Sequence, residues 1–288
     1  MDIWNAIAFG VTQGITEFLP ISSTAHLILL PAFFKWEDPG LAFDVALHLG
    51  TFLAVAWYFW RDLVDLCSAW FRSLHSPDLH NDPQQRLAWF VLIGCIPGGL
   101  SGVLLEHYAE STFRNPLLIG MAMVGFGLLM ALAELLGRRT LDEKTMKWRQ
   151  ALAVGLAQAI AIIPGASRSG VTITAGLLTG LEREAAARFS FLLGVPIVFG
   201  AVAYKVKDLF HVNSDSQMTL LIGIVASTVM GYLSIKFLLA FLRKRSTGIF
   251  IVYRLLIGSM LVILALTQQI PTRQPQLTQI SHTRSMAN

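Results

Sequence analysis

Long apolar runs alternate with short polar connections along most of the chain. Two apolar regions, at about 3–34 and 150–180, are broken by glycine, proline and polar residues. Six other runs are continuous and long enough to cross a bilayer as helices, at about 42–60, 86–105, 116–136, 186–204, 218–241 and 249–267. The pattern predicts an all-α, polytopic integral membrane protein with about six transmembrane helices, in which each broken region forms a re-entrant hairpin.

The two broken regions resemble each other. GVTQGITEFLP, which ends at Pro20, matches GLAQAIAIIP, which ends at Pro164, 144 residues later. A serine follows three residues after each proline, at Ser23 and Ser167. Weak repetition with interrupted hydrophobic segments in matching places is typical of inverted-repeat membrane folds that bind ligands near the midplane. A chance likeness between two helices rich in glycine and alanine is the alternative.

The repeat predicts one membrane domain, residues 1–268, with halves at about 1–137 and 150–268, followed by a polar tail at 269–288. Charge sets the orientation. With the N-terminus outside, four connections facing the cytoplasm hold thirteen of the 22 Lys and Arg residues, against six outside and three, including Arg254, at membrane depth. Those connections lie at 61–86, 137–149, 181–188 and 242–248. The two hairpins then enter from opposite faces, although the count does not distinguish hairpins from pairs of full spans.

Composition agrees with this class and excludes others. Hydrophobic residues make up 54% of the chain and charged residues 14%, whereas a soluble domain carries about 25% charged residues. No basic face with reading elements appears, so nucleic-acid binding is not expected. Two cysteines, one of them inside an apolar run, do not suggest a disulfide framework or a zinc site.

Polar residues inside the broken regions are the candidates for function. The first region carries Glu17, Ser23, Thr24 and His26 in TEFLPISSTAH, and the second carries Arg168 in PGASRSG. An ionisable group at membrane depth is costly and marks a functional site by default. If the two regions meet, one cavity holds a carboxylate, an imidazole, a guanidinium and several hydroxyls.

These groups suit phosphate chemistry. Arg168 offers a planar fork of donors, and a helix beginning after PGASRSG would aim its positive end at an anion. A serine hydroxyl can attack phosphorus when a base takes its proton, and His26 or Glu17 could be that base. Gln13 and Glu17 face the same way on a helix, and they could hold a divalent cation that bridges phosphate oxygens.

Structural roles compete with each of these assignments. Serines near a helix break often cap helices. Glu17 and Arg168 could form a structural buried pair, and His26 could be a core histidine bonded to a carbonyl. Asp44 and His48, at the start of the 42–60 run, look more like an interfacial pair than ligands.

The motifs QGITEFLPISSTAH and PGASRSG, in this order and at this spacing, resemble those of the undecaprenyl-diphosphate phosphatase family of the bacitracin-resistance type. FDVALHLGTFLAV and GLEREAAARFSFLLGVPIVFGA also fit, so the resemblance covers roughly residues 1–266. Members are bacterial inner-membrane enzymes that remove the terminal phosphate of undecaprenyl diphosphate and recycle the carrier for cell-wall synthesis. The resemblance implies the same hydrolysis here, stimulation by a divalent cation (Mg²⁺ or Ca²⁺) and a site facing the periplasm, and it is compatible with a homodimer.

The resemblance also implies roles for single residues. The expected catalytic residues are Glu17, Ser23, His26 and Arg168, with Glu17 also a metal ligand. The expected phosphate-binding residues are Gln13, Thr24, Gly165, Ser167, Ser169 and Gly170. The family's first motif begins with Glu or Gln, and the amide at Gln13 leaves Glu17 as the one carboxylate. Gln13 is therefore expected to bind rather than to act as a base.

Two other functions fit parts of the sequence. Inverted repeats and midplane charge also suit a transporter or flippase of a phosphorylated isoprenoid lipid. A phosphatidic-acid-type lipid phosphatase would need a PSGH motif and a later Arg–His pair. SSTAH resembles PSGH only weakly. The next histidine after SRSG is His211, too far along the chain to form the later Arg–His pair.

Overall fold

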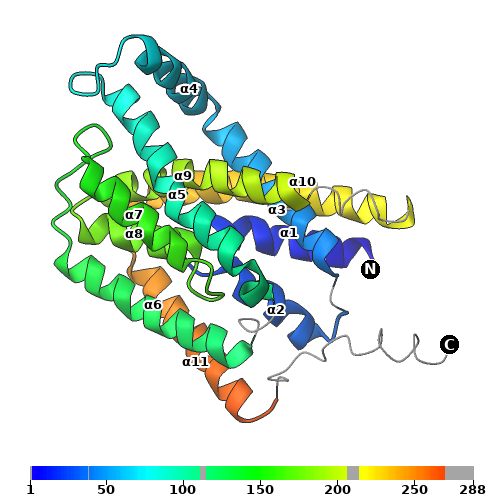
Figure 1. Ribbon diagram of the computed structural model, residues 1–288. Coiled ribbons are helices and arrows are strands. Elements are labelled where there is room, and N and C mark those ends of the chain that lie inside the picture. The colour runs from blue at the N-terminus through cyan, green and yellow to red at the C-terminus, as the bar shows by residue number, and fades with distance from the viewer. Residues whose placement is uncertain (1, 38, 111–114, 206–213, 270–288) are drawn as a thin grey trace, which may run out of the picture.

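The computed structural model describes residues 2–37, 39–110, 115–205 and 214–269, and over these residues the chain is helical, with no strand (Figure 1). The helices are α1 (Ile3–Phe18), α2 (Ser23–Phe34), α3 (Leu41–Tyr58), α4 (Trp60–His75), α5 (Pro83–Glu110), α6 (Pro116–Leu136), α7 (Trp148–Ile160), α8 (Arg168–Leu178), α9 (Arg183–Lys205), α10 (Ser214–Leu242) and α11 (Gly248–Leu266). The predicted all-α class is confirmed. The polar tail, from residue 270, lies outside the described residues.

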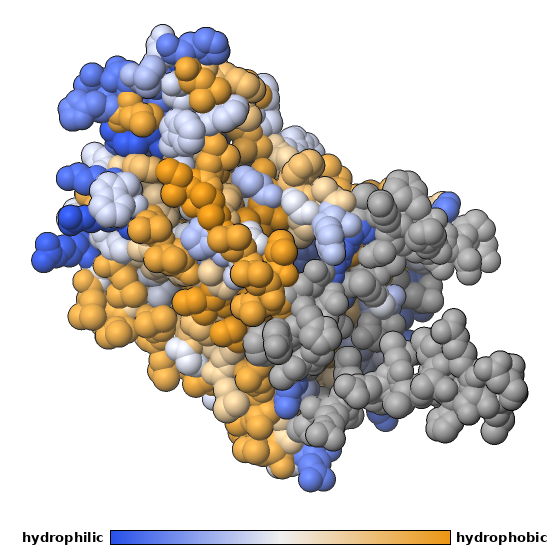
Figure 2. Space-filling view, viewed as in Figure 1, coloured by the Kyte–Doolittle hydropathy of each residue, from blue (hydrophilic) through white to orange (hydrophobic). Residues whose placement is uncertain are grey.

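Among the described helices, α5, α6, α9, α10 and α11 are long and apolar enough to cross a membrane individually. A sixth candidate is the pair of α3 and α4, which is long and apolar enough only when the two helices are taken together and which is bent by 76° between them. These six elements match the six continuous apolar runs of the sequence. Figure 2 shows hydrophobic residues over much of the visible face and hydrophilic residues gathered at the upper left, where α4 lies. The chain is a multi-pass membrane protein.

The connection predicted at 61–86 contains a helix, because α4 occupies its first half. Leu66 and Ala69 are buried against the body of the protein, whereas Val64 and Phe71 are exposed. Apolar residues three and four apart define helix faces, and charged neighbours such as Asp65 hide this spacing in the sequence. Such an amphipathic helix, bent away from a spanning one, is typical of the membrane surface.

Each broken region folds as two short helices joined by a loop, at 19–22 and at 161–167. The longest of the four helices, α1, has 16 residues. At about 1.5 Å per residue it is about 24 Å long, which is shorter than the hydrocarbon core of about 30 Å. Re-entrant hairpins have helices of this length. In Figure 1, α7 and α8 lie toward the left and α1 and α2 toward the right.

Matching glycine contacts hold the short helices against long ones. A Cβ atom on Gly10 of α1 would lie 2.7 Å from the carbonyl oxygen of Gly223 on α10. A Cβ atom on Gly155 of α7 would lie 2.6 Å from the carbonyl oxygen of Gly94 on α5. Small residues let helices approach closely inside a membrane. The first helix of each half therefore packs in the same manner on a long helix of the other half, α1 on α10 and α7 on α5.

The helices α6 and α11 end the two halves and cross at Gly120 and Gly258. A Cβ atom on either glycine would lie 2.9 Å from the carbonyl oxygen of the other. A contact that is the same in both directions is the signature of two elements related by a twofold axis. This reciprocal crossing and the matching glycine contacts agree with the predicted inverted repeat.

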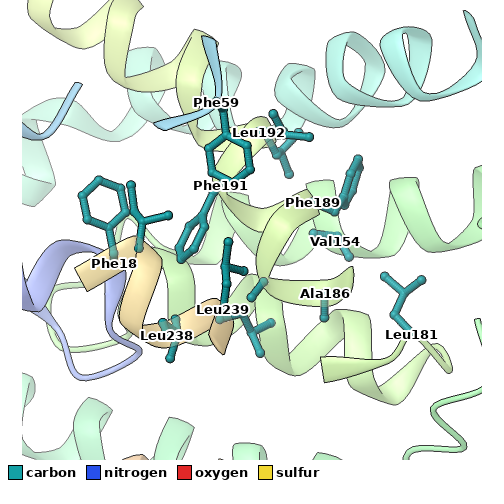
Figure 3. Close-up of a cluster of buried hydrophobic side chains, with 14 of the residues drawn as sticks. Phe18, Phe59, Val154, Leu181, Ala186, Phe189, Phe191, Leu192, Leu238 and Leu239 are labelled. Atoms are coloured by element: carbon teal, nitrogen blue, oxygen red, sulfur yellow. The ribbon is translucent and has the colours of Figure 1, made fainter. Parts of the chain in front are cut away.

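The largest hydrophobic cluster packs the end of α1 against α9 (Figure 3). The rings of Phe18 and Phe191 meet edge to face, with centroids 5.4 Å apart and planes at 89°. Phe59, at the end of α3, also contacts Phe191, with ring centroids 6.3 Å apart. Edge-to-face pairs stabilise beyond the area they bury. Because Phe18 follows Glu17 directly, this cluster fixes the position of the first candidate residue.

Candidate functional site

The loops of the two broken regions meet and enclose a polar cavity of about 170 Å³. Both regions and α3 contribute to its wall, which is lined by Glu17, Ser22, Ser23, Thr24, His48, Ala161, Ile163, Gly165, Ser167 and Arg168. The residues at the N-terminal ends of α2 and α8 are among them. Two positive helix ends therefore converge on one cavity, where the sequence predicted only the second. Such an arrangement favours an anion.

An ion pair connects the two broken regions across this cavity. Arg168 Nη2, in the first turn of α8, donates to Glu17 Oε1, in the last turn of α1, at 3.0 Å. The side chains are only 15% and 9% exposed, respectively. Arg168 Nη1 donates to the carbonyl oxygen of Ser190 at 3.3 Å. A guanidinium has more donors than these contacts use, so Arg168 can hold an anion as well.

Glu17 is also the acceptor for two neutral side chains. Its Oε2 accepts a hydrogen bond from Ser23 Oγ at 2.9 Å and another from Gln13 Nε2 at 3.2 Å. The carboxylate is thus placed to receive the proton of the Ser23 hydroxyl. Of the candidate residues, Ser23 has the geometry of a nucleophile beside its base.

Gln13 is one of the two residues predicted to hold a divalent cation. Its side chain is fully buried, and in the described part of the chain its Oε1 has no hydrogen-bond partner. A buried acceptor without a partner is costly and requires an explanation. An amide oxygen and a carboxylate are ligand types that a hard divalent cation accepts, but Gln13 turns its Nε2 toward Glu17 and is not among the residues that line the cavity. No cluster of three or more His, Cys, Asp or Glu side chains suited to a metal ion occurs in the described ranges.

Ser22 and Ser167 precede α2 and α8 with the same unusual backbone. Their φ and ψ angles are 77° and 98° for Ser22 and 68° and 113° for Ser167. A positive φ is uncommon outside glycine and costs free energy. The structural partner of Ser167 is therefore Ser22, 145 residues earlier. The proline-based match of Ser23 with Ser167 is off by one residue, because the two prolines sit at different places in their loops.

The offset of 145 residues shows which residues of the two broken regions correspond. The same offset of 145 residues pairs Ser23 with Arg168 and Glu17 with Ile162. The first region therefore supplies the acid and the hydroxyl, and the second supplies a guanidinium at the place of the hydroxyl. The two halves are alike in backbone and complementary in chemistry.

Arg254 of α11 joins the two loops from behind. It is fully buried. Its Nη1 donates to the carbonyl oxygen of Pro20 at 3.2 Å, and its Nη2 donates to those of Gly165 at 2.9 Å and Ala166 at 3.0 Å. Its Nε donates to the carbonyl oxygen of Met123 at 3.3 Å. Its charge at membrane depth met the criterion that selected Arg168, but no motif around Arg254 indicates its role.

His26 lies beside the cavity and is not part of its wall. Its Nδ1 is 2.7 Å from the carbonyl oxygen of Ser22, and its Nε2 is 2.6 Å from Tyr253 Oη. The two rings stack with centroids 5.6 Å apart. Both ring nitrogens are therefore engaged, in the manner of the carbonyl-bonded histidine that the sequence left open.

His48 also lines the cavity. The sequence favours an interfacial pair of His48 with Asp44 over a ligand role, and that pair stays a prediction. Its Nδ1 contacts the backbone carbonyl of Asp44, at 2.8 Å. The available signal was an imidazole inside an apolar run, the same signal that selected His26.

The remaining predicted residues divide between the cavity and its support. Thr24 and Gly165 line the cavity, and Gly165 adopts φ 90° in a place where a Cβ atom would clash with the carbonyl oxygen of Ile119. Ser169 is fully buried and donates to the carbonyl oxygen of Leu19 at 3.2 Å. Gly170 makes room for Arg254. Ser169 and Gly170 hold the loops together and do not line the cavity.

Comparison with known proteins places the chain among relatives of similar length. Residues 6–260 match the family model described as bacitracin resistance protein BacA. A protein of Moorella thermoacetica named undecaprenyl-diphosphatase is 48% identical over 263 residues, which cover 91% of this chain and 97% of the relative. Undecaprenyl-diphosphatase 2 of Stutzerimonas stutzeri is 46% identical over 268 residues, which cover 92% and 98% of the two chains. The undecaprenyl-diphosphatase of Nitrosococcus oceani is 46% identical over 265 residues, with 92% and 99% covered.

Proposed function

Because the chain belongs to the bacitracin resistance protein BacA family, we propose that it hydrolyses undecaprenyl diphosphate to undecaprenyl phosphate and inorganic phosphate. The relatives named undecaprenyl-diphosphatase support this activity over nearly their whole length. One observation in the structure carries the proposal. Glu17, Ser23 and Arg168, from two distant parts of the chain, meet in a polar cavity at two helix N-termini.

In the proposed binding step, the terminal phosphate enters this cavity. Arg168 and backbone N–H groups at the starts of α2 and α8 hold its oxygens. Phosphate oxygens then compete with Glu17 for the Arg168 guanidinium. A carboxylate released from its ion pair accepts a proton more readily. Substrate binding therefore prepares Glu17 to act as a base.

In the proposed chemical step, Ser23 Oγ attacks the terminal phosphorus and passes its proton to Glu17 Oε2. The bond from phosphorus to the bridging oxygen breaks, its electron pair goes to that oxygen, and undecaprenyl phosphate leaves. Water then hydrolyses the phosphoserine and releases inorganic phosphate. The hydrogen bond from Ser23 to Glu17 supports this choice of base. The assignment of His26 as base stays a prediction, since Tyr253 holds its Nε2.

The cation belongs to the proposal as well. Glu17 is the protein group that would hold it, and Gln13 Oε1 would join Glu17 once the amide, whose Nε2 faces Glu17, turns over. When bound, a divalent cation supplies positive charge that neutralises phosphate oxygens.

The proposal also covers the membrane in which the protein lies, its orientation and its oligomeric state. We place the chain in the bacterial inner membrane, with the basic connections in the cytoplasm and the cavity open to the periplasm. The excess of Lys and Arg in those connections supports this orientation. The homodimer that the family resemblance permits is part of the same proposal.

Phosphate release in detergent tests the function against the flippase alternative. Purified protein given a short-chain prenyl diphosphate is expected to release inorganic phosphate, because hydrolysis needs no membrane. Detergent micelles have no two sides, so a flippase would produce nothing there. Lipid movement in vesicles without any phosphate release would favour the flippase.

A matched pair of glycine substitutions tests the position of Arg168. A Cβ atom on Gly194 of α9 would clash with Arg168 Nη1, whereas one on Gly200 of the same helix meets nothing within 4 Å. Gly194→Ala is therefore expected to displace the guanidinium and lower kcat/KM about 100-fold, the usual cost of losing one anion-stabilising donor. Gly200→Ala should leave kcat/KM unchanged. Equal activity of the two variants would show that the position of Arg168 does not matter.

A further inference from the structure

His48 lines the cavity, and one of its two ring nitrogens, Nδ1, is engaged by the backbone. Nδ1 contacts the backbone carbonyl oxygen of Asp44 at 2.8 Å. A carbonyl only accepts hydrogen bonds, so Nδ1 must carry the proton and donate it. In the neutral ring Nε2 is then the unprotonated nitrogen, which accepts protons. Imidazole is also the side chain that most often serves as a general base in enzymes.

The helix around His48 is held rigidly. On one side of His48, the carbonyl oxygen of Leu47 accepts a hydrogen bond from Ser227 Oγ at 2.9 Å. On the other side, that of Gly50 accepts one from Thr228 Oγ1 at 3.0 Å. Both donors lie on α10, which fixes the rotation of α3 at this position. A proton-transfer group needs such a fixed position to be effective.

The proposed reaction does not yet include a base that accepts the proton of the attacking water. Glu17 takes the proton of Ser23 in the first step and returns it when the phosphoserine is broken, so it does not serve the attacking water. Gln13 is an amide and does not accept a proton, and His26 is held by Tyr253. Arg168 does not give up its proton in proteins. Of the charged and titratable groups that line the cavity, Glu17, Arg168 and His48, only His48 is left.

We propose that His48 is a catalytic residue, the base that activates water for hydrolysis of the phosphoserine. This inference rests on the proposed function. The water oxygen forms a bond to phosphorus while its proton passes to His48 Nε2. The bond from phosphorus to Ser23 Oγ breaks, its electron pair goes to Oγ, and Oγ recovers the proton held by Glu17. Inorganic phosphate leaves, and His48 returns its proton to solvent.

The experiment measures the phosphoserine directly. Purified wild-type, His48→Gln, His75→Gln and Ser23→Ala proteins are mixed with a short-chain prenyl diphosphate in detergent, quenched in acid and examined for phosphate bound to Ser23. Glutamine keeps a polar side chain but does not accept a proton. His75 is an exposed histidine on α4, so His75→Gln makes the same chemical change away from the cavity.

His48→Gln is expected to lower steady-state turnover about 100-fold, the scale of a lost general base, and to accumulate protein phosphorylated at Ser23. Wild type and His75→Gln should turn over normally with little phosphoserine. Normal turnover in His48→Gln, or slow turnover without phosphoserine, would overturn the role of His48. If Ser23→Ala keeps wild-type turnover, the covalent route itself fails, and the role of His48 fails with it.

Discussion

Replacing Arg168 with lysine is expected to lower kcat/KM for undecaprenyl diphosphate by about 100-fold or more. Lysine keeps the positive charge, so Glu17 does not become an uncompensated buried anion, and the protein should fold. A lysine ammonium is a point charge without the planar fork of arginine. It therefore does not reproduce the planar set of donors that Arg168 offers to Glu17 in the free protein and to phosphate oxygens once substrate is bound.

Phosphate release by purified protein in detergent measures this effect. Arg61→Lys is the matched control, since Arg61 lies exposed on α4, outside the cavity. It makes the same chemical change and should retain wild-type kcat/KM. If Arg168→Lys also retains it, a single positive charge is sufficient and Arg168 does not clamp the phosphate.

Replacing Arg254 with methionine should destabilise the protein and abolish hydrolysis. The guanidinium donates to four buried carbonyl oxygens, three of them in the two loops that form the cavity. Each buried acceptor left without a donor costs about 1–3 kcal/mol. No carboxylate pairs with Arg254 among the described residues, so the variant leaves no unpaired acid behind. A loss of about 3 kcal/mol or more in unfolding free energy is expected.

Thermal unfolding in detergent measures the stability of this variant. Lys236→Met is the control, because Lys236 is a basic residue within the long apolar helix α10 and is exposed. Its removal deletes one positive charge without breaking buried hydrogen bonds. If the two variants unfold at the same temperature as wild type, Arg254 does not hold the loops together.

The sequence predicted those features that depend on local pattern. Apolar runs located the spans, because a bilayer demands about 20 apolar residues for each crossing. Glycine, proline and buried charge located both halves of the site, because broken backbone and ionisable groups at membrane depth need a purpose. The resemblance of the two motifs to a known family then indicated the chemistry.

The features that sequence reasoning missed depend on tertiary contact. Arg254 lies 234 residues from Pro20 and 89 from Gly165, and only the fold brings the three together. His48 is an imidazole inside an apolar run, but that it lines this cavity depends on the packing of α3 against α10. The pairing of Ser22 with Ser167 is seen in their backbone angles, and aligning the two prolines does not reveal it.

The most direct test of the central claim, a phosphatase site shared between the two broken regions, is the product balance in detergent. Wild-type and Glu17→Gln proteins are each given undecaprenyl diphosphate, and inorganic phosphate and undecaprenyl phosphate are counted. We expect wild type to form the two products in equal amounts and Glu17→Gln, which has lost the proton acceptor for Ser23, to form almost none. Wild type that forms no inorganic phosphate, or Glu17→Gln that forms as much as wild type, would contradict the account.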